Sequence, residues 1–151
     1  MSYFPNFTSV VSMSAAQFMA LVGSPLPLAP GRAGCIIDIK SIVIVFTQGT
    51  VPFSGGSGNL SISTGSTFAL GLVGYAGAII PVGNFNNVTE PLIVWGTPWW
   101  TGPGSGGSQQ SATPLSDVEG FGITLNNNNG TNPTQGNGTF KIYLEYSYIV
   151  A

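Results

Sequence analysis

The chain has 151 residues, of which 43% are hydrophobic but only 5% are charged, and its formal net charge is −2. An average globular protein carries about 25% charged residues, so the polar surface of this chain must consist of Ser, Thr, Asn, Gln and Gly. With no His and one Cys there are too few ligands for a zinc or transition-metal site, and three basic residues cannot neutralise a track of phosphates, which argues against nucleic-acid binding.

Length and composition predict a single domain with a real hydrophobic core. We expect an irregular aromatic arm over residues 1–12, followed by one β-domain over residues 13–151. No basic region precedes the first apolar segment, so a signal peptide is not supported and we expect synthesis in a cytoplasm. A weakly charged surface suits a chain that is packed in an assembly.

A short helix is predicted near the start of the chain. Ser14 and Gln17 have the spacing of a capping box, in which each side chain satisfies a backbone donor of the first turn. The apolar stripe that follows consists of Ala15, Phe18, Met19 and Val22. Gly23 and Pro25 end it, so we expect a two-turn helix that plugs one end of the β-structure.

Two long strands organise the prediction. The segment 136–150 alternates strictly, and its predicted buried residues are Phe140, Ile142, Leu144, Tyr146, Tyr148 and Val150. The other long strand, Cys35–Phe46, is apolar on both faces from Ile42 onward. Its second half must therefore be covered twice, either as a central strand of a sandwich or by a second subunit. We expect a homo-oligomer, with a trimer as the preferred form.

Shorter strands fill the rest of the chain. They are predicted at 59–63, 68–72, 91–95 and 121–125, with a buried strand or irregular core segment at 74–82. The segment 74–82 is too short to span a membrane, which needs about 20 apolar residues. We expect 91–95 to be buried and 121–125 to pair antiparallel with the closing strand through the loop 126–138. Seven or eight short strands with one minor helix predict an all-β fold, an antiparallel β-sandwich of jelly-roll type.

Aromatic residues outside regular strands are the candidate binding residues. Trp99 and Trp100 are adjacent in a Gly- and Pro-rich loop, so both cannot point into one core from an extended chain. They either cap the open end of the sandwich or contact a partner, and the sequence favours neither. The candidate interface residues are Tyr3, Phe4, Phe7, Trp99 and Trp100.

One pair of carboxylates has a spacing that catalysis could use. Asp117 and Glu119 would share a face of a strand, as the two carboxylates of a glycosidase lie close together. No third polar partner lies nearby in sequence, and the chain lacks the histidine that usually serves in acid–base catalysis. We therefore interpret them as solvated or interface carboxylates and expect no enzymatic activity and no cofactor.

Three stretches together resemble a known protein type. The runs Met13–Leu21, Ser24–Gly31 leading into Cys35–Phe46, and Gly136–Tyr146 are similar to small β-rich virion structural proteins of tailed bacteriophages. The resemblance implies a capsid decoration (cement) protein, which sits on the capsid surface as a homotrimer and binds the major capsid protein. The alternative is a receptor- or carbohydrate-binding module of a phage tail or fibre, with Trp95, Trp99 and Trp100 as stacking platforms.

Overall fold

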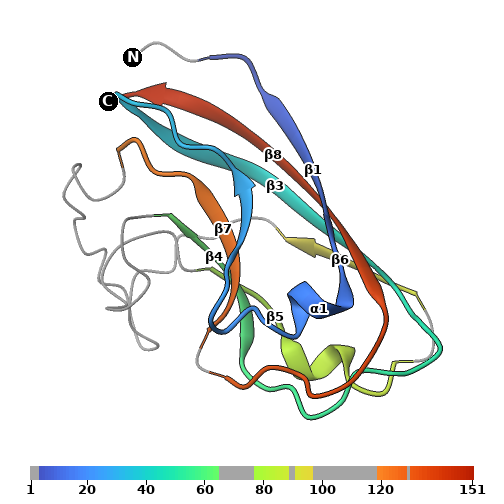
Figure 1. The fold of residues 1–151 in the computed structure, drawn as a ribbon. Helices are drawn as coiled ribbons and strands as arrows, with labels where there is room; N and C mark the ends of the chain where they lie inside the picture. The colour runs from blue at the N-terminus through green and yellow to red at the C-terminus, as the bar shows by residue number, and fades with distance from the viewer. Residues whose placement is uncertain (1–3, 65–76, 89–90, 97–118, 129) are drawn as a thin grey trace, which may run out of the picture.

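The computed structural model describes residues 4–64, 77–88, 91–96, 119–128 and 130–151. The strands in these residues are β1 (Phe7–Met13), β2 (Leu26–Ala29), β3 (Cys35–Thr47), β4 (Asn59–Thr64), β5 (Gly77–Pro81), β6 (Leu92–Gly96), β7 (Ile123–Asn128) and β8 (Thr139–Val150). The helices are α1 (Ala15–Phe18) and the 3-10 helix η2 (Val82–Phe85). The prediction of an all-β chain with little helix is confirmed (Figure 1).

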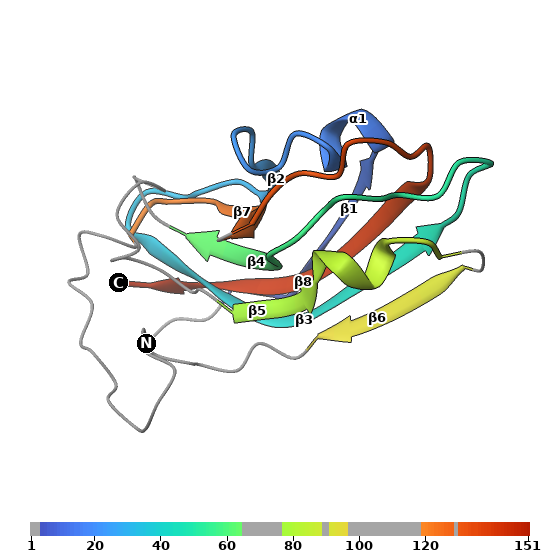
Figure 2. The same cartoon turned by 90° about the horizontal axis from the view of Figure 1, so that it is seen from below.

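The strands form two four-stranded sheets with the orders β1-β8-β3-β6 and β2-β7-β4-β5. Every pairing between named strands is antiparallel. Figure 2 shows β2, β7 and β4 on one side of the molecule and β8, β3 and β6 on the other. Along the chain, β4 and β5 are the consecutive strands that pair directly, whereas each other connection leads from one sheet to the other.

The predicted pairing of the last two strands is wrong. Strand β7 pairs with β2 and β4, whereas β8 pairs with β1 and β3 in the other sheet. The connection between β7 and β8 does not form a hairpin loop. Its backbone instead makes hydrogen bonds to the segment that precedes β4. The Thr134 amide donates to the Ser54 carbonyl at 3.0 Å, and the Asn137 amide donates to the Val51 carbonyl at 3.1 Å.

The alternation predicted for the closing strand is confirmed at five of its six apolar positions. Phe140, Ile142, Leu144, Tyr146 and Tyr148 are buried, whereas Val150 at the end of β8 is exposed. Strand β3 lies beside β8, but its alternation shifts where the register slips between Ile39 and Ser41. Because this bulge adds one residue, Ile37 and Ile39 before it and Ile42 and Ile44 after it all face the core.

Both sheets contribute to one hydrophobic core. Sheet β1-β8-β3-β6 supplies the buried aromatic residues of β8 together with Ile37, Ile39, Ile42, Ile44 and Ile142. The other sheet supplies Leu26, Leu28, Leu60, Ile62, Ile123 and Leu125. These residues belong to a single buried cluster to which both sheets contribute.

Helix α1 is shorter than predicted, although its cap is confirmed. The Ser14 hydroxyl accepts from the Gln17 amide at 3.2 Å, and Gln17 Oε1 accepts from the Ser14 amide at 2.9 Å. The helix covers only four residues and is followed by turns. As a result Leu21 is fully buried, whereas Val22, which was predicted to belong to the apolar stripe, is 40% exposed.

The helix places Phe18 in a group of five phenylalanines at one end of the core. This phenylalanine cluster consists of Phe18, Phe46, Phe53, Phe85 and Phe140, all of them buried. Ring centroids in contact within the cluster lie 4.5 to 6.0 Å apart, mostly in tilted or edge-to-face orientations. The expectation that the helix closes one end of the β-structure agrees with this position.

Two further predictions need correction. Residues 7–12 were expected to be irregular, but they belong to β1, which pairs with β8 from Phe7↔Tyr146 to Met13↔Phe140. Segment 91–95 was expected to be buried, but among the described strands β6 pairs only with β3 and lies at the edge of its sheet. Ile93 of β6 is 59% exposed. Part of the apolar composition that suggested burial of this strand therefore lies on the outer face of the sheet.

Candidate interaction surface

The outer face of sheet β1-β8-β3-β6 carries a group of apolar side chains. We call it the outer-face patch, and its residues are Val10, Val43, Val45, Ile93 and Tyr143. Val10 is 52% exposed and Tyr143 is 36% exposed, whereas Val43 and Val45 are half-buried. The face of the sheet that does not meet the core is therefore apolar near its middle.

Strand register brings these residues together from four separate strands. Tyr143 of β8 is directly opposite Val10 on one side and Val43 on the other. In the next row, Val45 is directly opposite Ile93 of β6. Directly opposite side chains in a sheet lie about 5 Å apart, so the patch is contiguous. The bulge between Ile39 and Ser41 gives Val43 and Val45 their outward positions.

Two charged side chains flank Tyr143 along β8. Lys141 precedes it by two positions and is exposed, and it has no ion-pair partner among the residues that the structure describes. Glu145 follows Tyr143 by two positions and is half-buried. Its carboxylate accepts from Asn6 Nδ2 at 3.2 Å and from the Ser41 hydroxyl at 3.4 Å. The ion pair between Lys40 and Asp38 lies farther along the same face.

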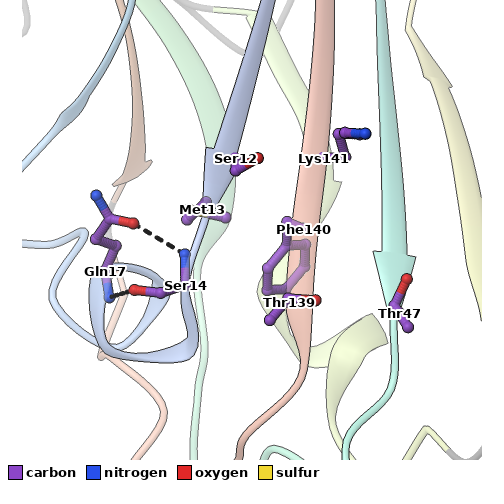
Figure 3. A pocket seen from close by; sticks show the side chains of 8 residues that line it. All are labelled: Ser12, Met13, Ser14, Gln17, Thr47, Thr139, Phe140 and Lys141. Atoms are coloured by element: carbon purple, nitrogen blue, oxygen red, sulfur yellow. Dashed lines mark hydrogen bonds between the residues drawn. The ribbon is translucent and has the colours of Figure 1, made fainter.

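An open hollow of about 530 Å³ adjoins the patch where β1 meets α1. Its lining consists of Ser12, Met13, Ser14, Gln17, Thr47, Thr139, Phe140 and Lys141 (Figure 3). Ser14 and Gln17 are held in place by their capping box. Lys141 is the one ionisable side chain in this lining, so the hollow offers hydrogen bonds and a positive charge but no acid–base pair.

The candidate interface residues of the N-terminal arm pack on the domain itself. The Phe4 amide donates to the Tyr148 carbonyl at 3.2 Å, and the Phe7 ring stacks on Tyr146 with centroids 5.6 Å apart. The Arg32 guanidinium lies 4.0 Å from the centroid of the Phe4 ring. We call Phe4, Phe7, Arg32, Tyr146 and Tyr148 the tyrosine cluster. Tyr3, Trp99 and Trp100 lie outside the described residues.

Within the tyrosine cluster, Tyr148 is fixed by its hydroxyl. That hydroxyl donates to the Pro30 carbonyl at 2.8 Å. Burial raises the pKa of Tyr148 above its usual value of 10.0, because the phenolate would lose hydration. The neutral, hydrogen-bonded form of Tyr148 is therefore the one that the folded domain favours.

The residues considered for catalysis are only partly described. Glu119 is half-buried in a turn before Gly120, and Asp117 lies outside the described residues. Over the part of the chain that the structure describes, no group of three or more His, Cys, Asp or Glu side chains could hold a metal ion. In the same part, no helix has the length and apolarity needed to cross a membrane.

No protein-family model, curated protein or solved structure matches the chain. The sequence prediction anticipated a second cover over the strand from Ile42 onward, but it did not identify Val10, Ile93 or Tyr143 as parts of the same surface. The alternation along β8 could have identified Tyr143, because it places Tyr143 on the same outward face as Lys141 and Glu145.

Proposed function

We propose that the protein is a virion structural protein, a capsid decoration protein that binds and stabilises the lattice of the major capsid protein of a tailed bacteriophage. In this proposal it performs no catalysis and needs no cofactor. It acts on the capsid surface after synthesis in the host cytoplasm, and the resemblance implies that it does so as a homotrimer.

The order of the strands is the observation that carries the proposal. In β1-β8-β3-β6 and β2-β7-β4-β5, equivalent positions hold consecutive strands: β1 and β2, β8 and β7, β3 and β4, β6 and β5. This is the order expected when a long antiparallel ribbon rolls up into two facing sheets. We therefore propose that the domain is a jelly-roll β-sandwich. Jelly rolls of eight strands are common in viral capsid proteins and in lectins.

The proposed mechanism is binding linkage. A protein that binds the assembled lattice but not free capsid subunits stabilises the assembled state by mass action. The low charge of the chain supports contacts made by apolar burial and neutral hydrogen bonds, since five acidic and three basic side chains offer little long-range attraction. Trp99 and Trp100 enter the proposal from the sequence alone, as aromatic anchors for the capsid subunit.

The proposal is tested by binding the purified chain to capsids that lack it. Removing an interface aromatic typically costs about 2 kcal/mol or more, so Trp99→Ala and Trp100→Ala are expected to weaken attachment about 30-fold. Circular dichroism should show an unchanged fold. Val51→Ala, at an exposed apolar position, is the matched control and should bind as the wild type does.

Two results would overturn the proposal. Capsid binding unaffected by both tryptophan changes would remove the proposed anchors. If the tryptophan changes abolish glycan binding and leave capsid attachment intact, the protein is a receptor-binding module of a tail or fibre. Copy number gives an independent check, because a decoration protein is present in numbers that match the capsid lattice, whereas a tail or fibre protein is present in a handful of copies.

A further inference from the structure

The outer-face patch has a symmetric arrangement about one row of residues. Val10, Tyr143 and Val43 form a row across β1, β8 and β3, perpendicular to the strands. On one side of this row, Lys141 is opposite Ser12. On the other side, Glu145 is opposite Thr8. The central row is thus aromatic and aliphatic. In one flanking row, Lys141 lies between Ser12 and Val45, with Ile93 beyond Val45, and in the other, Glu145 lies between Thr8 and Ser41.

The two charges cannot neutralise each other within one chain. They are four residues apart along β8, and at about 3.4 Å per residue this separates them by about 14 Å. Among the described residues, Lys141 has no ion-pair partner, and the Glu145 carboxylate accepts hydrogen bonds from the neutral groups of Asn6 and Ser41. The surface therefore presents a positive and a negative group on opposite sides of an apolar row.

A rotation of 180° about the axis of the central row brings the charged residues of two copies into complementary positions. The rotated copy places its Lys141 across from Glu145 and its Glu145 across from Lys141. It also places Thr8 across from Ser12 and Tyr143 across from Tyr143. Facing sheets pack about 10 Å apart, a gap that Lys and Glu side chains span together.

We propose that a second copy of this chain covers the outer-face patch, packed face to face about a two-fold axis along the row Val10–Tyr143–Val43. The contact is isologous, with the same residues on both sides. Charge complementarity identifies the occupant, because the pattern on this face is matched by the same face of another copy. The partly exposed Tyr143 lies on the axis, where burial of an aromatic contributes most to an interface.

This inference deepens the proposed function by naming the partner of the patch, and it concerns contacts other than those proposed for the capsid. A two-fold contact gives a dimer. If three-fold contacts also form, as the resemblance implies, the two-fold contact joins two trimers into a hexamer. The isolated chain is therefore expected to form assemblies of two or six copies.

Sedimentation and light scattering over a concentration series test the stoichiometry. Masses of two or six copies support the proposal, whereas a monomer or a plain trimer at every concentration overturns it. These measurements use the isolated chain, so they separate the two proposals. Self-association without capsid binding would contradict the proposed function alone, and capsid binding by a chain that forms only trimers would contradict this inference alone.

Charge exchange tests which surface is used. Lys141→Glu places like charges against Glu145 of the other copy, and Glu145→Lys places like charges against Lys141. Each variant alone is expected to self-associate about tenfold or more weakly, because like-charge contacts across an interface are strongly unfavourable. An equimolar mixture of the two variants should recover association, since every facing pair is then opposite in charge. The double variant K141E/E145K should recover it as well.

Failure of both the mixture and the double variant to recover association would overturn the proposed geometry, as would single variants that associate like the wild type. Circular dichroism and thermal unfolding must show that each variant is folded. If Glu145→Lys does not fold, Tyr143→Ala takes its place and is expected to weaken association about tenfold or more, against Val51→Ala as the unchanged control.

Discussion

The two ends of strand β8 carry aromatic clusters of opposite character. The phenylalanine cluster, around Phe140, consists of buried rings without a polar atom. The tyrosine cluster, around Tyr148, contains a hydroxyl bonded to a backbone carbonyl and a guanidinium over the Phe4 ring. Figure 1 shows α1 near the first end of β8 and the chain terminus C at the other. The first end closes the core, whereas the second holds the N-terminal segment against it.

This difference indicates where stability resides. At the phenylalanine end, buried area and ring contacts add together, and aromatic pairs contribute about 0.5–1.5 kcal/mol beyond their burial. At the tyrosine end, Tyr146 and Tyr148 are buried, but Phe4 and Phe7 of the N-terminal segment are only half-buried. We therefore expect large losses of stability from changes at the first end and small ones at the second.

The largest loss is expected for Phe140→Ala. The Phe140 ring contacts Phe18, Phe46, Phe53 and Phe85. Removing a buried phenylalanine ring typically lowers the free energy of unfolding by about 3–5 kcal/mol. Urea unfolding of both proteins measures the loss, with Phe4→Ala as the matched change in the tyrosine cluster. Equal losses for the two variants would show that the clusters do not differ as described.

Gly136→Ala should be the next most disruptive change. Gly136 has a φ of 134°, and a Cβ atom there would overlap the Phe53 ring. Backbone strain of this kind costs about 1–3 kcal/mol, and displacement of Phe53 would disturb the phenylalanine cluster as well. Gly23→Ala is the control, because nothing lies within 4 Å of a Cβ at Gly23. A stable Gly136→Ala protein would mean that the loop before β8 adapts without moving Phe53.

Ser14→Ala should lower the free energy of unfolding by about 1 kcal/mol, the usual effect of losing an N-cap. The change removes the hydroxyl that accepts from the Gln17 amide, at the helix that places Phe18 in the cluster. Thermal unfolding measures the loss. Ser24→Ala, at an exposed serine after the same helix, should leave the melting temperature unchanged. A neutral Ser14→Ala variant would show that packing alone holds the helix.

Arg32→Ala should have a smaller effect, about 0.5–1 kcal/mol, as expected for a cation–π contact near the surface. The guanidinium lies over Phe4, so the loss should affect the N-terminal segment more than the whole domain. Hydrogen exchange of the Phe4 amide, which donates to the Tyr148 carbonyl, reports this local loosening. Unchanged exchange would mean that the backbone bond and the Phe7 stack hold the segment without Arg32.

The pH dependence of the tyrosine cluster should be the subtlest effect. The pKa of Tyr148 is raised on folding, mainly by burial, so above pH 10 the folded state binds more protons at this site than the unfolded state. The stabilising contribution of Tyr148 is therefore complete below pH 10 and is lost as pH rises past that value. Unfolding measured along a pH series should show a steeper alkaline loss for the wild type than for Tyr148→Phe. Parallel curves would contradict the raised pKa.

Local patterns in the sequence were sufficient for the features that depend on local geometry. The capping box of Ser14 and Gln17, the strand Cys35–Phe46 (observed as Cys35–Thr47) and the alternation of β8 were all predicted, since each is fixed by spacing within a short segment. The pairing of β7 and β8 was predicted wrongly, because a long polar loop does not reveal whether it returns to the same sheet. The edge position of β6 was missed for a similar reason, since burial depends on neighbours distant in sequence.

The candidate surface depends even more on long-range register. The apolar run from Ile42 to Phe46 indicated that two faces needed cover, but the residues that join Val43 on the outer face come from β1 and β8. The phenylalanine cluster was equally hidden, because Phe53 and Phe85 lie outside the named strands and have no periodic neighbours. Nothing in a local pattern pairs a loop residue with a strand that follows much later.

The position of β8 between β1 and β3 also affects how the protein is made. A ribosome releases β1 and β3 long before β8. Neither strand can therefore pair with its neighbour at the centre of the sheet until β8 has emerged. Pairings between distant segments form slowly, and unpaired strand edges promote aggregation while they wait. A low growth temperature or a chaperone that shields β3 would each be expected to raise the yield of folded protein.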